Sequence, residues 1–312
     1  MILTPLERYD THTLLGLRFW DRLTQQCITD GLIVTAQRLS QNRSQRLGKP
    51  VRGIITPSGA IAFLGLTAAE RPLAGDSNLW DNPPDAQLVV IDLVDRRSQF
   101  LPMSFTARLP FRGIFCGQGD WLRTSLLRPE PLPGEALGIQ LWSAPTRSLP
   151  PGRALIRAQL VVGTSDRPAA YALMRVRLPA SESEPELELD YFAMADHQGQ
   201  VALPMPYPRV PEPESASTPY PSLDQQLFAL RVTVQYQEIP SLPGRDVPDL
   251  EALLTQSPAH IGDRWTTDAT PRLRSRDSLS INLQFGQPLI LRTARGPGAN
   301  ALQESVLRIL PT

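Results

Sequence analysis

The hydrophobic and polar positions of this chain alternate in short runs that are typical of β-strands. The strongest run, residues 87–94, is almost continuously apolar and rich in β-branched side chains. β-Branched residues favour strands, and an uninterrupted apolar run favours a strand that is buried on both faces. We therefore expect a central strand there. Shorter or alternating runs predict further strands at residues 15–21, 29–36, 100–109, 136–142, 154–162, 170–178, 187–193, 226–236 and 305–310.

Turns with a glycine at the tip lie between some of these runs. Residues 54–63 consist of two apolar arms joined by Pro-Ser-Gly, in which proline presets φ and Gly59 takes a positive φ, so they predict a tight β-hairpin. Residues 195–203 place Gly199 between two apolar arms in the same way. The two turns follow the preceding strands at similar spacing, which predicts two copies of one β-sandwich plan.

The predicted fold class is all-β, with two tandem Ig/transthyretin-like β-sandwich domains and a mostly β C-terminal extension. The extension is expected to contain one short helix at residues 248–255, because Pro248 and Asp249 suit a first helical turn. It is also expected to contain a hairpin at residues 279–292 with a Gly-X turn. The expected organisation is an N-terminal arm (1–13), a first sandwich (14–115), a Pro/Gly-rich connector (116–151), a second sandwich (152–240) and the C-terminal extension (241–312).

Composition and charge narrow the function classes. The 312 residues include 32 prolines, which favour short strands and long fixed loops because proline ends helices and interrupts central strands. The formal net charge is zero, so charge gives no reason to expect a nucleic-acid partner. The apolar runs are far shorter than the ~20 residues of a spanning helix. Residues 1–10 lack the basic start and apolar core of a signal peptide. We expect a soluble cytoplasmic protein without direct membrane insertion.

Residues that could carry chemistry are sparse and separated. His12, His197 and His260 have no partner at metal-ligand spacing. Ser58 lies in a turn and not in a Gly-x-Ser-x-Gly elbow. The acidic run 181–190 could bind a cation, but its alternation of acid and leucine is better explained by an edge strand whose charges face water. We therefore expect no cofactor, no metal and no enzymatic activity.

The cysteines and tryptophans leave alternatives open. Cys27 and Cys116 are expected to be buried, inert thiols, and a disulfide requires that their geometry allow it. The five tryptophans could form a sugar platform, but core or subunit-contact roles are favoured because tryptophan is enriched at interface centres. They are Trp20, Trp80, Trp121, Trp142 and Trp265, and the candidate interface residues among them are Trp121, Trp142 and Trp265.

Several motifs resemble known families. Residues 17–21, 30–34 and 56–59 resemble carboxypeptidase-regulatory-like and Cna-B-like sandwiches, which are transthyretin-type folds that act as spacers or interaction modules. Some Cna-B domains close a Lys–Asn cross-link, but Lys49, the single lysine here, falls in a polar loop that does not suit it. Other runs are similar to a family encoded beside phage-tail-like contractile injection systems, namely residues 100–102, 141–147, 201–208 and 285–292.

This resemblance implies a non-enzymatic structural or assembly subunit of a phage-tail-like contractile injection system, expected at the baseplate. The implied partners are other particle subunits (baseplate, sheath or spike components), with this chain present in multiple copies of a symmetric assembly. The particle is expected in the cytoplasm, where partners could join it to a membrane. The resemblance transfers no catalytic residue. The alternative hypothesis is a glycan-binding or adhesive β-sandwich module that uses exposed tryptophans.

Overall fold

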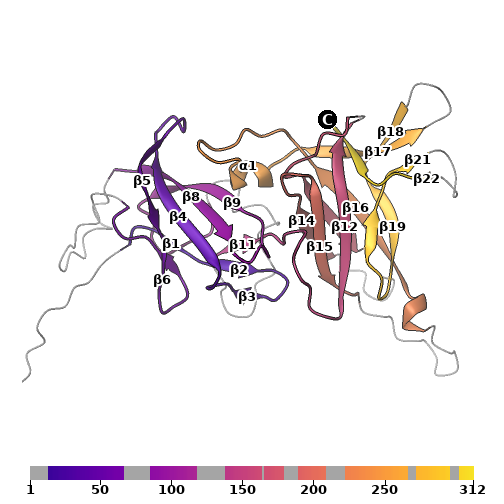
Figure 1. The fold of residues 1–312 in the computed structure, drawn as a ribbon, viewed down its shortest axis with the longest axis horizontal. Coiled ribbons are helices and arrows are strands. Elements are labelled where there is room, and N and C mark those ends of the chain that lie inside the picture. Colours follow the sequence, from indigo (N-terminus) through magenta and orange to yellow (C-terminus); the bar gives the residue numbers. More distant parts are fainter. Residues whose placement is uncertain are drawn as a thin grey trace, which may run out of the picture. The chain divides into compact units, whose positions relative to one another are not determined.

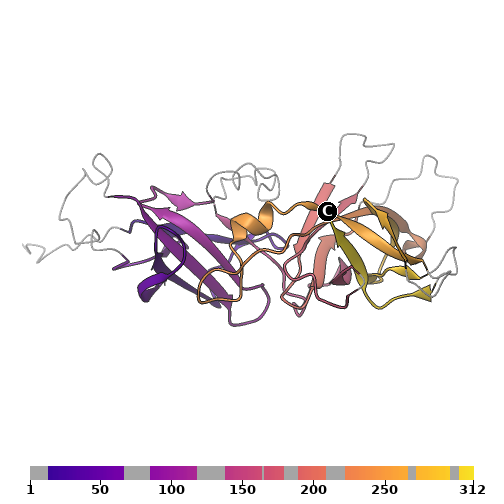
Figure 2. The same ribbon diagram turned by 90° about the horizontal axis from the view of Figure 1, so that it is seen from above.

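Strands make up most of the regular secondary structure of the described residues (Figures 1 and 2). Among the described residues, 52% lie in strands and 4% in helices, which confirms the predicted all-β class. The computed structural model describes residues 13–66, 85–117, 138–163, 165–178, 189–208, 222–265, 272–295 and 302–312.

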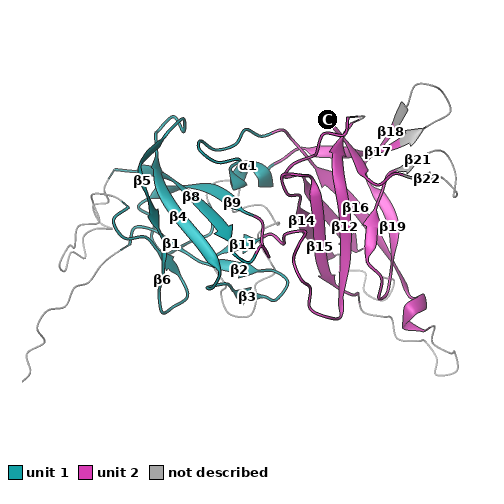
Figure 3. Cartoon of the chain, viewed as in Figure 1, with its two compact units in different colours: residues 1–97, 102–141, 239–255 teal, residues 98–101, 142–238, 256–312 magenta. Residues whose placement is uncertain are grey.

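Two compact units divide the chain (Figure 3). The predicted C-terminal extension, residues 241–312, is shared between them, since its first part belongs to unit 1 and the rest to unit 2. Unit 1 consists of residues 1–97, 102–141 and 239–255, and unit 2 of residues 98–101, 142–238 and 256–312.

The described residues of unit 1 form three sheets. The predicted central strand is β8, which lies between β4 and β9 and confirms the prediction from its continuous apolar run. The first sheet has the order β5 (Arg46–Arg52), β4 (Leu32–Leu39), β8 (Gln87–Asp95), β9 (Met103–Leu109). The second has the order β10 (Ile114–Phe115), β1 (Gly16–Leu17), β7 (Ile61–Ala62), β6 (Ile54–Ile55). The third has the order β11 (Ile139–Leu141), β2 (Phe19–Asp21), β3 (Gln26–Cys27).

The inner face of the first sheet forms the core of unit 1. Ala36, Ile91 and Phe105 stand side by side in register on β4, β8 and β9, and all three are fully buried. The Phe105 ring stacks on Phe115 with 5.8 Å between ring centroids. Alternate side chains of a strand point to opposite faces, so the neighbouring positions on β8 point outward.

Residues 239–255, here called the covering segment, enclose the outer face of that sheet. Leu242 of this segment forms a buried cluster with Leu39, Leu88 and Val90. The segment carries α1 (Leu250–Leu254), which contacts β9 and lies at one end of the unit 1 strands (Figure 2). The α1 N-cap carboxylate, that of Asp249, accepts a hydrogen bond from the Glu251 backbone at 3.2 Å, as is typical of a helix start. The predicted short helix is therefore confirmed.

Unit 2 is built on one 12-stranded sheet whose inward side chains form a single buried cluster. A short 3-10 helix, η3 (Leu223–Gln225), precedes β16. The main path of the sheet is β14 (Leu189–Met194), β13 (Leu173–Leu178), β16 (Leu227–Gln235), β17 (Pro258–Trp265), β23 (Leu307–Pro311), β12 (Arg153–Val162), β15 (Gln200–Pro206). The remaining strands are β18 (Arg272–Arg276), β19 (Leu279–Gln284), β20 (Leu289–Leu291), β21 (Ala294–Arg295), β22 (Leu302–Gln303).

One strand-pairing scheme recurs in both units. In unit 1, β4 pairs antiparallel with β5 and β8, while β1 pairs antiparallel with β7 and parallel with β10. In unit 2, β13 pairs antiparallel with β14 and β16, while β12 pairs antiparallel with β15 and parallel with β20. The corresponding strands follow one another along the chain in the same order in both units. The β-sandwich plan that the sequence pattern predicts twice is thus repeated in the topology.

The glycine-tipped turns also repeat. Gly59 and Gly199 adopt φ values of 75° and 78°, in the left-handed region that favours glycine. In each turn the first residue, Thr56 or Asp196, donates its backbone N–H to the carbonyl four residues later. Its side-chain oxygen accepts a hydrogen bond from the backbone N–H of that same later residue, at 3.2 Å for Thr56 and 2.8 Å for Asp196.

Two of the three predicted hairpins are corrected by the pairing. β6 and β7 do form a hairpin around Gly59. The arms around Gly199, β14 and β15, instead pair with β13 and β12 respectively. Likewise, β19 pairs with β16 and β20 with β12, on either side of the turn at Gly286. The local sequence specifies the turn, but the partner of each arm depends on where its apolar face meets the core.

Candidate functional site

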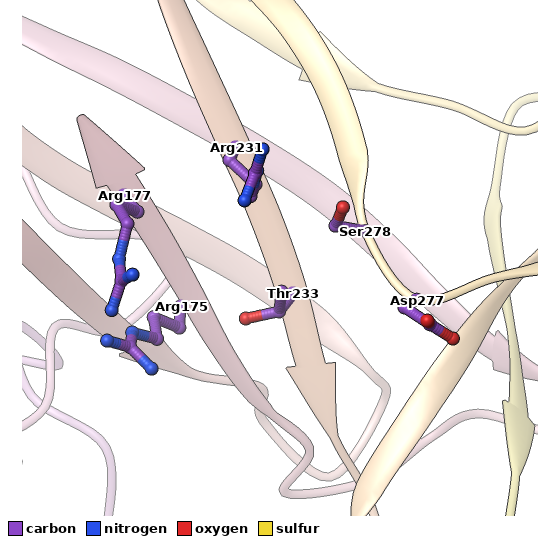
Figure 4. Close-up of a pocket in the computed structure, with 6 residues that line it drawn as sticks. All are labelled: Arg175, Arg177, Arg231, Thr233, Asp277 and Ser278. Atoms are coloured by element: carbon purple, nitrogen blue, oxygen red, sulfur yellow. The ribbon is translucent and has the colours of Figure 1, made fainter. Parts of the chain in front are cut away.

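A shallow groove of about 250 Å³ lies on unit 2 (Figure 4). Arginines from two adjacent strands dominate its lining. Figure 4 shows Arg175 and Arg177 on one strand, β13, and Arg231 and Thr233 on its neighbour, β16. We call these four residues the arginine face. The groove is completed by Asp277 and Ser278, between β18 and β19.

Strand alternation places these side chains on the outer face of the sheet. Met174 and Val176 point into the core, so the arginines beside them on β13 point outward. Val232 is buried in the same core, which turns its neighbours on β16 outward as well. The register then sets Arg175 opposite Thr233 and Arg177 opposite Arg231.

Asp190, on β14, supplies the carboxylate of this face. Arg175 donates to it through Nε at 2.9 Å and through Nη2, and Arg177 donates through Nε at 3.0 Å and Nη2 at 3.3 Å. Burial opposes ionisation, but these donors outweigh it and lower the pKa of Asp190. The Arg175 guanidinium also lies 5.7 Å from the ring centroid of Phe192. Both arginines are therefore held in place.

This ion pairing corrects one prediction. The acidic run 181–190 was expected to turn its charges toward water, whereas Asp190 is paired with two arginines. Residues 181–188 lie outside the described residues. β14 does lie at an end of the main sheet path, as the edge-strand prediction requires.

Arg231 contrasts with its two neighbours. Its side chain is exposed, and within the described part of the chain no carboxylate forms an ion pair with it. Its cross-strand partners are Arg177 on one side and Ser280 on the other. Like charges directly opposite each other are unfavourable. Asp277, at the rim, has its Oδ1 2.8 Å from His260 Nδ1. Among the described residues, Arg231 is therefore a cation of this face that has no carboxylate partner.

The sequence contained a signal for this face. Arg-Val-Arg in the predicted strand 170–178 and Arg-Val-Thr in the predicted strand 226–236 each place polar residues at alternate positions. Alternation predicts that each strand has one polar face. The register, which brings the two polar segments side by side, depends on the tertiary pairing.

The described residues include two of the three tryptophans proposed for an interface, Trp142 and Trp265. Trp142 is buried, with 3% of its surface exposed. Trp265 is the last residue of β17. Trp121 lies outside the described residues. An interface role for these three tryptophans stays a prediction.

The other candidate residues are dispersed. Cys27 and Cys116 are free and half-buried, and burial raises the pKa of both thiols. His197 is exposed in the turn before Gly199, and His12 lies outside the described residues. Within the described ranges, no group of three His, Cys, Asp or Glu side chains is placed to hold a metal ion. No helix in those ranges has the length and apolar character needed to cross a membrane.

Comparison with known proteins gives distant structural neighbours. No protein-family model matches the chain, and no curated protein matches it. The TIE protein of Bacillus anthracis aligns with 6% identity and a TM-score of 0.22, over 95% of this chain and 34% of that one. This chain therefore spans about a third of that protein's length. A candidate adhesin from Bacteroides ovatus aligns with 9% identity and a TM-score of 0.18, over 71% of this chain and 72% of that one. TM-scores this low carry no argument about fold or function.

Proposed function

We propose that this chain is a non-enzymatic structural subunit of a phage-tail-like contractile injection particle, located at the baseplate and bound there to neighbouring subunits. The observation that carries this proposal is the contrast between two equivalent sheet faces. The face in unit 1 is enclosed by the covering segment, whereas the face in unit 2 is open and lined by arginine. Arginine forms bidentate contacts and is enriched at interface centres, so an open arginine face suits a subunit contact.

Well-anchored connections also suit an assembly subunit. Arg308, which is 5% exposed, pairs with Glu304 at 2.7 Å. It also donates to the backbone carbonyls of Gly163 and Ser165 at 3.1 and 3.2 Å. A buried guanidinium bound in this way fixes the connection that follows β12. Order that already exists before binding lowers the entropy lost on assembly. The choice of a contractile injection particle, among possible assemblies, is based on the sequence resemblance to a contractile-injection family.

Mass spectrometry of intact particles from producing cells tests this proposal. The chain should co-purify with sheath and tube subunits through a density gradient, in a constant ratio to them across the particle fractions. Cryo-electron microscopy of the same fractions should show its two β units at the baseplate. If the cells contain the chain but their intact particles lack it, the proposal is wrong.

A further inference from the structure

We propose that the arginine face of unit 2 docks an extended, carboxylate-bearing segment of a partner protein, with Arg231 as its main contact. This inference rests on the proposed function, in which the chain assembles with protein partners, and it names the chemistry of that contact. Arg175 and Arg177 flank the site and Thr233 adds a hydroxyl group. Three observations support it: the way the equivalent face is covered in unit 1, the charge of the arginine face, and the spacing of its side chains.

Unit 1 shows how such a face is covered. β4 and β8 of unit 1 correspond to β13 and β16 of unit 2 in the repeated pairing scheme. In unit 1 the covering segment brings an acidic residue, Asp249, whose carboxylate accepts a hydrogen bond from Thr106 Oγ1 at 2.9 Å. Arg43 Nη1 lies 3.9 Å from the same carboxylate. A segment that bears a carboxylate at the start of a helix therefore already covers the corresponding sheet of unit 1, with its carboxylate beside β9.

The charge of the arginine face favours a carboxylate as the ligand. Arg175 and Arg177 both pair with Asp190, whereas Arg231, which stands directly opposite Arg177, forms no ion pair with any carboxylate of the described residues. A carboxylate placed beside Arg231 would relieve this like-charge contact. It would also accept the paired N–H groups of the guanidinium, which match carboxylate geometry.

The spacing of the face suits an extended segment. Arg175 and Arg177 are two positions apart on one strand, which separates them by ~6.8 Å. An extended partner segment repeats its side chains on one side at the same interval, so acidic residues at every second position match the face. Asp190 and Phe192 hold Arg175 in position before any partner arrives, which reduces the conformational entropy lost on binding.

Fluorescence anisotropy with the full-length protein tests this inference. The probe is a labelled ten-residue peptide of alternating Glu and Thr, and the matched peptide replaces every Glu with Gln. We expect the Glu peptide to bind, the Gln peptide not to bind, and the affinity for the Glu peptide to fall as NaCl is added. Arg231→Gln should weaken binding about tenfold, the size expected for a lost hydrogen-bonded charge pair.

Two variants provide matched controls. Arg157 is an exposed arginine on β12, outside the arginine face, so Arg157→Gln should bind the Glu peptide as the native chain does. Arg231→Lys keeps the charge but loses the planar fork, so its affinity should lie between those of the native chain and Arg231→Gln. Equal binding by the native chain and Arg231→Gln would overturn the inference, as would equal losses in Arg231→Gln and Arg157→Gln.

Competition separates the partner classes. Unlabelled Glu peptide should displace the probe, whereas inorganic phosphate and sialyllactose at the same concentration should not. If either displaces the probe as well as the peptide does, the site takes small anions or acidic glycans and the inference is wrong. If the chain is present in particles but does not bind the Glu peptide, the inference fails while the proposed function stands. Arg231-dependent binding by a chain that is absent from particles supports the docking chemistry and overturns the proposed function.

Discussion

The outer sheet faces of the two units share one plan but differ in what covers them. In unit 1, Asp92 on β8 is 5% exposed and accepts hydrogen bonds from Arg46 Nη2 at 3.1 Å and Ser104 Oγ at 2.7 Å. The covering segment brings Arg245 to within 3.5 Å of the same carboxylate. In unit 2, Asp190 is only half-buried and Arg231 stays exposed. Coverage therefore decides whether an arginine–carboxylate cluster becomes part of the interior or remains an accessible surface.

The amino-acid pattern of the equivalent strands follows this difference. β8 carries apolar residues on both faces: Leu88 and Val90, which point outward, pack against Leu242 of the covering segment, and Asp92 on the same face is paired with arginine. β16, its counterpart, alternates instead, with Arg231 and Thr233 at outward positions. A strand that is covered on both sides excludes unpaired polar side chains, since burying them without a partner is unfavourable. A continuous apolar run thus indicates a strand that is covered on both faces, and an alternating run indicates a strand that is covered on one.

The largest effect should come from breaking the covered cluster. Asp92→Asn leaves Arg46, whose side chain is 14% exposed, with an uncompensated charge. We expect the free energy of unfolding to fall by about 3–5 kcal/mol, as for other buried pairs that lose one partner. Urea denaturation measures this change. The control is Asp30→Asn, because the Asp30–Arg97 pair is exposed and should contribute less than about 1 kcal/mol. Equal effects of the two substitutions would contradict the contrast between covered and open pairs.

Loosening the covering segment itself should have the next largest effect. Leu242→Ala removes the apolar contact to Leu88 and Val90 and should lower the free energy of unfolding by about 2–3 kcal/mol. Limited proteolysis should then cut within residues 239–255 faster than in the native chain. Leu64→Ala is the matched control, since Leu64 is 43% exposed and its truncation should change little. Unchanged cleavage would show that Leu242 does not hold the segment in place.

Lowering the pH should reduce the contribution of both arginine–carboxylate clusters to the free energy of unfolding. The pKa values of Asp92 and Asp190 are lowered in the folded state, because hydrogen bonds from arginine outweigh the effect of burial. Each pair therefore stabilises the fold above the unfolded Asp pKa of about 3.9, and this contribution is lost as pH falls through the folded pKa. Denaturation at pH 7 and pH 3 measures it. Asp190→Asn should reduce the pH dependence by about 1 kcal/mol or less, because its cluster is half-exposed. An unchanged pH dependence in this variant would contradict the pairing.

The smallest expected effect is a gain in stability, in contrast to the losses predicted above. Arg231→Gln removes a like charge directly opposite Arg177 and should raise the free energy of unfolding by about 0.2–1 kcal/mol. Thermal denaturation at low salt measures this gain, which added salt should diminish. Arg157→Gln, on β12, should leave stability unchanged. A loss of stability in Arg231→Gln would mean that Arg231 is already paired within the fold.

Features with local causes could be predicted from the sequence. The β8 run, the positive-φ glycines at Gly59 and Gly199, and the helix start at Asp249 all depend on nearby residues. Strand partners and the arginine face could not be predicted in this way. Arg177 and Arg231 lie on strands joined through a long stretch of intervening chain, and their juxtaposition depends on which residues of each strand reach the core. The arms around Gly199 show the same limit, because their turn was predicted but their partners were not.

By itself, the sequence determined an all-β chain of short strands, in which a similar succession of strands and a glycine turn occurs twice. Backbone preference, side-chain alternation and turn chemistry act over a few residues, which is why these features can be read locally. Only the tertiary structure decided that residues 239–255 return to cover unit 1 and that Arg231 stays open on unit 2. The physical reason is that coverage of a sheet face is a contact between segments distant in sequence, and its free energy depends on how those segments pack together.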